Sequence, residues 1–261
     1  MEARTSHAAA SPPLRVEVVP VGYYLDRVVV PIQKHNADRV YLVKARTKEE
    51  DRAAPFRSKV IELLRRWKPK LEIRLVGTDL WDLGSAVETF SAILRSESEL
   101  GNSVWVNLST GSKLEAVAAA IACMAQGATP YYVRMESYDR PDLEKPLAQG
   151  VLAIDVVPTF DLSTPSSAGL AALGLLEENP SGLSKKSLLS GLTESGFMPP
   201  ESPDRTVQAR YARLQAILQP MLESPPLCSS SGNRRGTRIH ITERGRLALR
   251  MFAPRAGLTD S

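Results

Sequence analysis

Strand-like and helix-like segments alternate along the first 157 residues, and this order constrains the fold more than any other feature of the chain. Apolar runs, helical periodicity and short links favour parallel strands joined by right-handed crossovers. The predicted strands are residues 14–19, 40–43, 71–76, 103–107, 129–135 and 151–157, and the predicted helices are residues 23–36, 50–67, 80–94 and 111–126. The sequence therefore predicts an α/β domain with a doubly wound, Rossmann-like, mostly parallel sheet. Such sheets bind ligands at the carboxyl ends of their strands.

The pattern changes after residue 157. Residues 158–168 are rich in Pro, Ser and Thr and are typical of a hinge. Three helices, two short strands around a turn and a last helix are then predicted at residues 170–177, 184–195, 204–223, 227–230, 237–241 and 243–252. This order is typical of a winged helix-turn-helix domain. We expect a disordered tail at 1–13, a first domain at 14–160, a linker at 161–168 and a second domain at 169–255.

The net charge is concentrated in the second part of the chain. Residues 1–164 carry 21 Lys and Arg and 21 Asp and Glu, whereas residues 165–261 carry 12 and 8, which is the whole net charge of +4. A basic module beside a neutral one favours a polyanionic partner such as nucleic acid. A solvated charged face is the alternative at this point.

Neither a membrane span nor a secretory signal is expected. No apolar stretch reaches the roughly 18 residues of a spanning helix, and the first 13 residues lack the apolar core of a signal peptide. A cytoplasmic chain with Cys123 and Cys228 as free thiols follows. The three histidines are scattered, so we expect no metal site and no cofactor.

The fourth predicted strand ends in a turn whose chemistry suits a phosphate. The turn reads Asn107-Leu108-Ser109-Thr110-Gly111-Ser112-Lys113 and leads into a helix. A helix N-terminus presents unpaired N–H groups, Gly111 permits close approach of a ligand, and Lys113 adds a cation. Neither a P-loop nor a G-x-G-x-x-G fingerprint is present. An anion site and an ordinary strand–helix turn with a Ser cap are both compatible with these residues.

The stretch VWVNLSTGSKLEAVAAAIACMAQGATPYYV resembles the CARF domains of CRISPR-associated proteins, whose fourth strand ends in a similar turn. The run from Val19 to Arg27, which contains a Gly–aromatic pair and Asp-Arg, also resembles these domains. The resemblance spans residues 14–160. It implies a homodimer that binds a cyclic oligoadenylate, commonly the tetra-adenylate, at a shared pocket. The implied lining residues are Gly22, Tyr23, Asn107, Ser109, Thr110, Gly111, Ser112 and Lys113. Asp26 and Arg27 fit a salt bridge or a ligand contact equally well.

Two further loops follow the second and third strands. Lys44 and Arg46 are expected to be surface charges or, less simply, ligand contacts. Asp79 is expected to cap the next helix, and Trp81 is expected in the core or in a dimer interface.

The region 184–252 resembles the winged helices fused to CARF domains in archaeal-type transcription regulators. In a helix-turn-helix the second helix of the pair enters the major groove, so residues 204–223 are the expected recognition helix. The expected DNA contacts are Arg205, Thr206, Gln208, Arg210 and Arg213 on this helix and Arg234, Arg235 and Arg238 on the wing. A winged helix used only for dimerisation or protein contacts is the alternative.

The resemblances together imply a CRISPR-associated transcriptional regulator of antiviral defence, which binds cyclic oligoadenylate and double-stranded DNA, and they leave open whether it is also an enzyme. One alternative is a metal-independent ring nuclease that cleaves its ligand with Lys113, Ser109 and Ser112. A lesser alternative is a ribonuclease activated by cyclic oligoadenylate, because Arg235 and His240 have a catalytic spacing. The residues around His240 favour a strand, whereas that motif belongs on a helix.

Overall fold

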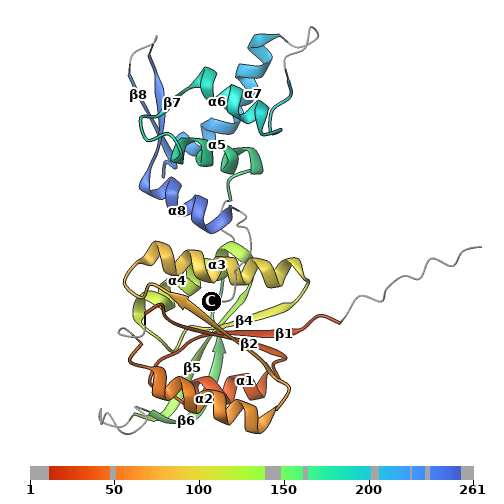
Figure 1. Ribbon diagram of the computed structural model, residues 1–261, viewed down its shortest axis with the longest axis vertical. Coiled ribbons are helices and arrows are strands. Elements are labelled where there is room, and N and C mark those ends of the chain that lie inside the picture. The colour runs from red at the N-terminus through yellow and green to blue at the C-terminus, as the bar shows by residue number, and fades with distance from the viewer. Residues whose placement is uncertain are drawn as a thin grey trace, which may run out of the picture. The chain divides into compact units, whose positions relative to one another are not determined.

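The chain divides into two compact units, the first ending at Phe160 and the second beginning at Asp161. A computed structural model (Figure 1) describes residues 12–47, 51–138, 148–160, 164–200, 206–223, 225–232 and 236–253. Among these residues, no helix is long and apolar enough to cross a membrane. Cys123 and Cys228 are free and buried. Burial raises the pKa of the Cys123 thiol to about 12.

The first unit is built on a six-stranded sheet in the order β3-β2-β1-β4-β5-β6. Its strands are β1 (Arg15–Pro20), β2 (Arg39–Ala45), β3 (Glu72–Thr78), β4 (Ser103–Asn107), β5 (Thr129–Tyr138) and β6 (Ala148–Val156). The first five strands are parallel, and β6 pairs with β5 in the antiparallel direction. Because β1 lies between β2 and β4, the strand order reverses there, and the loops after β1 and β4 emerge side by side.

Helices cover both faces of this sheet. Figure 1 shows α1 (Asp26–Lys34) and α2 (Ala54–Trp67) on one face and α3 (Leu83–Glu99) and α4 (Lys113–Gln126) on the other. The small side chains of Ala118, Ala119 and Ala122 are fully buried on α4. They let α4 approach the sheet and α3 closely. The predicted α/β architecture with a mostly parallel sheet is therefore confirmed.

Two details of the first unit differ from the sequence prediction. The last strand, β6, runs antiparallel, because only residues 139–147 separate it from β5 and a parallel crossover needs about a dozen residues or more. The predicted helix 23–36 begins only at Asp26, and Pro31 lies inside it rather than ending it.

The second unit combines four helices with a small antiparallel sheet in the order β7-β9-β8. Its elements are α5 (Ser167–Glu177), β7 (Leu183–Ser184), α6 (Lys185–Glu194), α7 (Val207–Leu222), β8 (Cys228–Ser231), β9 (Arg238–Ile241) and α8 (Glu243–Phe252). Leu173 and Leu176 of α5, Leu188 of α6 and Leu214 and Leu218 of α7 are fully buried in one core. The two-residue strand β7 was not predicted, because two residues are too few to show an alternating pattern.

Side-chain caps fix where the helices of the second unit begin. Ser166, Ser184, Thr206 and Thr242 each accept a hydrogen bond from a backbone amide three residues later. Such caps satisfy donors that have no partner within the helix. Val207 at the start of α7 is 55% exposed, because the contacts of this helix with the core start at Tyr211.

Candidate functional site

Two glycines bring the loops after β1 and β4 into direct contact. A Cβ atom on Gly22 would lie 3.0 Å from the backbone nitrogen of Gly111. Gly111 has a φ of +75°, and a Cβ there would lie 2.5 Å from the Cβ of Pro20. A side chain at Gly111 would therefore clash as well as strain the backbone. Close packing of these two loops requires glycine at both positions.

Asn107, the last residue of β4, holds the turn that follows it. Its side chain is fully buried, and Oδ1 accepts hydrogen bonds from the amide of Ser109 at 2.9 Å and from Ser109 Oγ at 2.5 Å. Its Nδ2 donates to the carbonyl oxygen of Arg27 at 2.8 Å. In a regular helix the amide of residue 31 would bond to that carbonyl, but Pro31 has no N–H. The Asn107 side chain thus satisfies the Arg27 carbonyl in place of the backbone N–H that Pro31 lacks.

Arg27 contacts the same turn from the α1 side. Its side chain is 5% exposed, and Nη1 donates to the carbonyl oxygen of Ser109 at 3.0 Å. The guanidinium lies over the Tyr24 ring, 4.5 Å from its centroid. The neighbouring Asp26 accepts a hydrogen bond from the amide of Gly150 in β6 at 3.0 Å. Both residues of the Asp-Arg pair therefore fix elements around the turn, a role that the sequence did not indicate.

The N-terminus of α4 is closed by a reciprocal cap. Ser112 Oγ accepts from the amide of Glu115 at 3.1 Å, and Glu115 Oε2 accepts from the amide of Ser112 at 2.7 Å. The Glu115 side chain is almost fully buried, and this burial raises the pKa of its carboxyl group. The Ser-x-x-Glu spacing is a recognisable capping signature that the sequence reasoning missed.

The groups of this turn that remain available for a ligand are suited to bind an anion. Ser112 and Lys113 are exposed, and the amides of Lys113 and Leu114 belong to the first helical turn, which has no intrahelical acceptors for them. The partial positive charge of the helix N-terminus adds to the charge of Lys113. The arrangement can therefore bind a phosphate group at the surface of α4.

The structure divides the eight implied ligand-binding residues into three groups. Gly22 and Gly111 shape the loops, as described above. Asn107, Ser109 and Thr110 are buried, and the first two are engaged in holding the turn. Tyr23, Ser112 and Lys113 are exposed. Tyr23 packs edge-on against Phe56 of α2, with the ring centroids 5.3 Å apart. Of the three residues considered for ring cleavage, Ser109 is 7% exposed with its hydroxyl bonded to Asn107.

A buried polar cluster lies behind the turn. Glu17 of β1 is 1% exposed, accepts from Tyr131 Oη at 2.8 Å and lies 2.5 Å from His35 Nδ1. Burial raises the pKa of Glu17 against the opposing effect of His35. Burial and the neighbouring Glu17 raise the pKa of Tyr131. A hydrogen bond with Asn107 opposes this rise but does not cancel it. No sequence pattern pointed to this cluster, because its members come from three separate elements.

Two sequence predictions for the loop after β3 differ from the structure. Asp82, not Asp79, caps α3 by accepting from the amide of Ser85 at 2.6 Å. Asp79 instead accepts from the amide of Trp81 at 2.9 Å, within the loop. Trp81 is 80% exposed, so its expected place in the core is wrong, and its place in a dimer interface stays a prediction. Arg46 of the loop after β2 reaches Ser85 Oγ with Nη2 at 3.3 Å.

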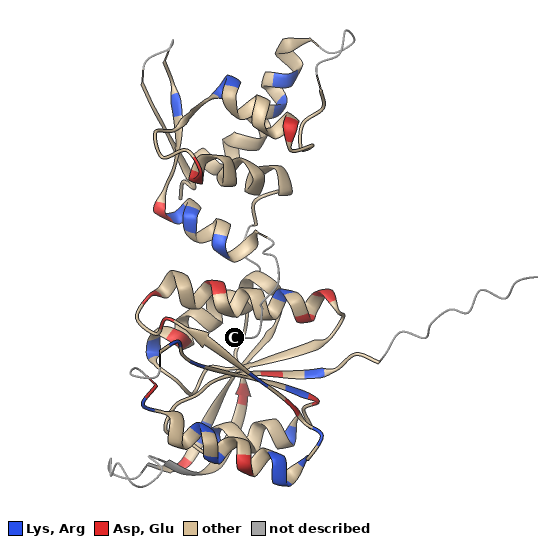
Figure 2. Cartoon of the chain, viewed as in Figure 1, with Lys and Arg blue, Asp and Glu red and all other residues tan. Residues whose placement is uncertain are grey.

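The residues predicted to contact DNA have different surroundings in the second unit. Arg205, Arg234 and Arg235 lie outside the described residues. Thr206 caps α7, Arg210 Nη2 donates to Thr193 Oγ1 at 3.1 Å, and Arg238 Nη1 donates to the carbonyls of Ser181 and Gly182 at 3.3 and 2.7 Å. Gln208 and Arg213 are exposed on α7. Figure 2 shows further Arg positions on α8.

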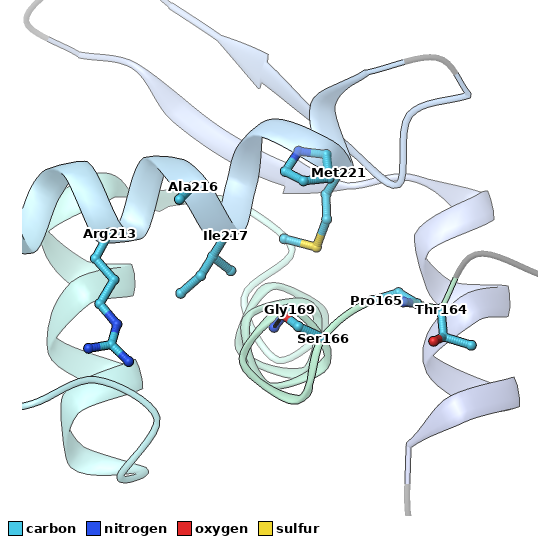
Figure 3. Close-up of a pocket in the computed structure, with 9 residues that line it drawn as sticks. Thr164, Pro165, Ser166, Gly169, Arg213, Ala216, Ile217 and Met221 are labelled. Atoms are coloured by element: carbon cyan, nitrogen blue, oxygen red, sulfur yellow. Dashed lines mark hydrogen bonds between the residues drawn. The ribbon is translucent and has the colours of Figure 1, made fainter.

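A cavity of about 330 Å³ lies between the start of α5 and α7. Figure 3 shows Arg213 and Thr164 lining it from different segments. Its other lining residues are Pro165, Ser166, Gly169, Ala216, Ile217, Pro220 and Met221. Arg213 therefore borders this mainly apolar cavity.

The described residues contain one of the two residues of the proposed ribonuclease motif, and they contain no cluster that could bind a metal. No group of three or more His, Cys, Asp or Glu is arranged to hold a metal ion in the described part of the chain. His240 lies in β9, where Nε2 is 2.8 Å from Ser231 Oγ, and its proposed partner Arg235 is outside the described residues.

Comparisons with known proteins show related domains and structures. A family described as HFX_2341_N:-like, N-terminal, matches residues 15–138. The chain is similar to Enterococcus italicus Csm6 bound to cyclic hexa-2'-fluoro-hexa-dAMP, with 9% identity and a TM-score of 0.44 over 79% of this chain and 55% of that one. It is also similar to Can2 from Sulfobacillus thermosulfidooxidans in complex with cyclic tetra-adenylate, with 12% identity and a TM-score of 0.38 over 91% of this chain and 63% of that one.

A third similar structure is a type III CRISPR defence DNA nuclease activated by cyclic oligoadenylate, with 15% identity and a TM-score of 0.39. That match covers 78% of this chain and 34% of the nuclease. The chain thus spans less than two thirds of the length of each of these proteins. No curated protein sequence matches the chain.

Proposed function

We propose that the first unit, residues 14–160, is a CARF domain that binds cyclic oligoadenylate, most simply the tetra-adenylate, in a homodimer. The observation that carries this proposal is the Gly22–Gly111 contact, which presents Lys113 and the first amides of α4 at the point where the strand order reverses. Phosphates bind at such a helix N-terminus. One chain supplies one such turn, and a cyclic ligand with two-fold symmetry matches two turns related by a dimer axis.

The second unit, residues 169–255, is proposed to be a winged helix-turn-helix that binds double-stranded DNA. Its order of helix, strand, two helices and hairpin is the order of that fold, with α7 as the recognition helix. Gln208 and Arg213 have exposed side chains of the kinds that contact base edges and phosphates. Ligand binding then changes DNA affinity through differential binding to two states of the dimer, which makes the chain a regulator of transcription.

Calorimetry with cyclic tri-, tetra- and hexa-adenylate tests the sensor. We expect saturable binding of at least one ring by the full chain, and a weaker affinity for Lys113→Gln. Lys59→Gln is the matched control, because Lys59 is also exposed but lies on α2, where it pairs with Glu62. No heat and no thermal shift with any ring would remove the proposal. Appearance of linear products that requires Lys113 would instead favour a ring nuclease.

Binding to DNA upstream of the protein's own gene tests the second unit. Arg213→Ala should weaken binding and reduce its dependence on salt by about one released counterion. Arg244→Ala removes an equal charge from α8 and should have a smaller effect. Equal effects of the two variants would argue for nonspecific attraction and against α7 as the recognition helix.

A further inference from the structure

Trp81 is an exposed aromatic residue with no partner in the described part of the first unit. Its side chain is 80% exposed, and it makes no ring contact with any described residue. A tryptophan buries a large apolar area when it is covered, so one held in water at a sheet edge is suited to contact something outside the chain. Its backbone is fixed, because the Trp81 amide bonds to Asp79 and the next residue, Asp82, caps α3.

Trp81 lies at the same edge of the sheet as the turn around Gly111. The helices α3 and α4 follow the parallel strands β3 and β4, so both begin at the carboxyl edge. Figure 1 shows the two helices side by side on one face of the sheet. Packed helices have axes about 8–10 Å apart. Because β2 and β1 lie between β3 and β4 in the sheet, the ends of β3 and β4 are three strand spacings, or about 14 Å, apart.

Arg46 brings a positive charge to this loop. It is exposed, and Nη2 contacts Ser85 Oγ in the first turn of α3 at 3.3 Å. The acidic residues nearby, Asp79 and Asp82, accept hydrogen bonds from backbone amides of their own loop. An exposed indole and a guanidinium on the loops of two neighbouring strands are a combination that can bind a nucleotide, with stacking on the base and attraction of the phosphate.

We infer that Trp81 and Arg46 form a second subsite, which stacks one nucleobase and holds one phosphate of a ligand anchored at Lys113. The inference rests on the proposed function, because the anchor is the turn after β4. A ligand must extend about 14 Å from that turn, which is three strand spacings, to reach the loop that carries Trp81. The subsite therefore discriminates by size, and it contributes more to binding of the larger rings than of cyclic tri-adenylate.

Intrinsic fluorescence and calorimetry with the three rings test this subsite in the full chain. The tryptophans are Trp67, Trp81 and Trp105. Stacking on Trp81 should quench fluorescence on binding, and Trp81→Ala should abolish the quench. The same variant should weaken the affinity for the tetra- or hexa-adenylate about tenfold, a magnitude typical of one stacked base. Trp67→Phe is the control and should keep both the quench and the affinity.

Salt dependence tests the role of Arg46. Arg46→Gln should weaken binding of the same ring and lower the slope of log Kd against log salt concentration by about one phosphate contact. Arg66→Gln, on an exposed side chain of α2, should change neither quantity.

The outcomes separate this inference from the proposed function. Unchanged affinity and quench in Trp81→Ala, with binding still lost in Lys113→Gln, would overturn the subsite and leave the sensor. Dissociation of the dimer by Trp81→Ala in sedimentation, without loss of affinity per subunit, would identify a subunit contact and also overturn the subsite. Absence of any binding by the unaltered chain would overturn both.

Discussion

Asn107 at the end of β4 and Arg27 of α1 are linked by a closed set of hydrogen bonds. Asn107 Nδ2 donates to the Arg27 carbonyl at 2.8 Å, while Arg27 Nη1 donates to the carbonyl of Ser109, whose amide returns to Asn107 Oδ1 at 2.9 Å. The contacts form a closed circuit, so the position of α1 and the shape of the turn depend on each other. A buried polar network makes the structure more rigid when each of its members has a hydrogen-bond partner.

Replacing Asn107 by Asp should break the circuit with almost no change in volume. A carboxylate oxygen would replace the Nδ2 donor and face the Arg27 carbonyl, so the free energy of unfolding should fall by about 1–3 kcal/mol. Tryptophan fluorescence during denaturant unfolding measures this in the first unit, because the three tryptophans lie before residue 106.

Asn102→Asp is the matched control for Asn107→Asp. Asn102 is also bonded on both sides, to the amide of Leu14 and to Glu97, but it precedes β4. Both variants should lose stability, and only Asn107→Asp should lose ligand affinity. An equal loss of affinity would contradict the assignment of Asn107 to the turn.

Gly111→Ala should be far more disruptive than Gly127→Ala, although the two glycines flank the same helix. Gly127 has a φ of +73° with no atom within 4 Å of an added Cβ, so only the left-handed backbone costs free energy, about 1 kcal/mol. At Gly111 the Cβ would also clash with Pro20 and Glu115, and the total cost should reach about 2–4 kcal/mol. Denaturant unfolding and ligand titration compare the two variants. Similar losses would show that the packing of Gly111 against Pro20 and Glu115 is not tight in solution.

Glu115 should make ligand binding sensitive to pH. Burial raises its pKa above the ordinary 4.5, so the stability that it contributes is complete below 4.5 and is lost as the pH rises through the raised value. In the same window its growing negative charge opposes a phosphate at α4. Affinity should therefore fall with rising pH in the unaltered chain and vary less in Glu115→Gln, which retains the acceptor of the cap. Glu62→Gln, on exposed α2, should reproduce the pH profile of the unaltered chain.

Arg210 should affect DNA binding partly through stability. Its contact with Thr193 Oγ1 joins α7 to α6, so Arg210→Ala and Thr193→Val should each lower the melting temperature of the second unit. A double-mutant cycle followed by circular dichroism should give a coupling of about 0.5–1.5 kcal/mol. Purely additive effects would contradict a stabilising contact between Arg210 and Thr193.

The local periodicity of the sequence accounts for most of the fold. β4 was predicted at its observed bounds, Ser103–Asn107, and α8 at Glu243–Phe252, because buried strands and capped helices carry strong local patterns. The direction of β6 was not foreseen, since it depends on the length of a connection rather than on a pattern within the strand. The N-cap of α3 was assigned to Asp79 instead of Asp82, because either aspartate fits the local rule and only the loop geometry chooses between them.

The residues of the candidate site were proposed from the sequence, but the separate structural role of each residue was not. Spacing and residue type placed Asn107, Gly111 and Lys113 in one turn. They could not show that Asn107 faces inward to a carbonyl freed by Pro31, because that partner lies 80 positions away in the chain. The exposure of Trp81 could not be predicted from the sequence either, because tryptophan side chains are mostly buried on average.

The reversed direction of β6 determines where the chain leaves the first unit. The pairing of Val156 with Tyr131 puts the end of β6 beside the start of β5, so residue 157 departs from the edge opposite the turn around Gly111. Five or six residues of strand separate those edges, which is about 17–20 Å. In the proposed regulator, the effect of a ligand bound at the turn would therefore have to cross the length of the sheet, or pass through a second subunit, before it reached residue 157.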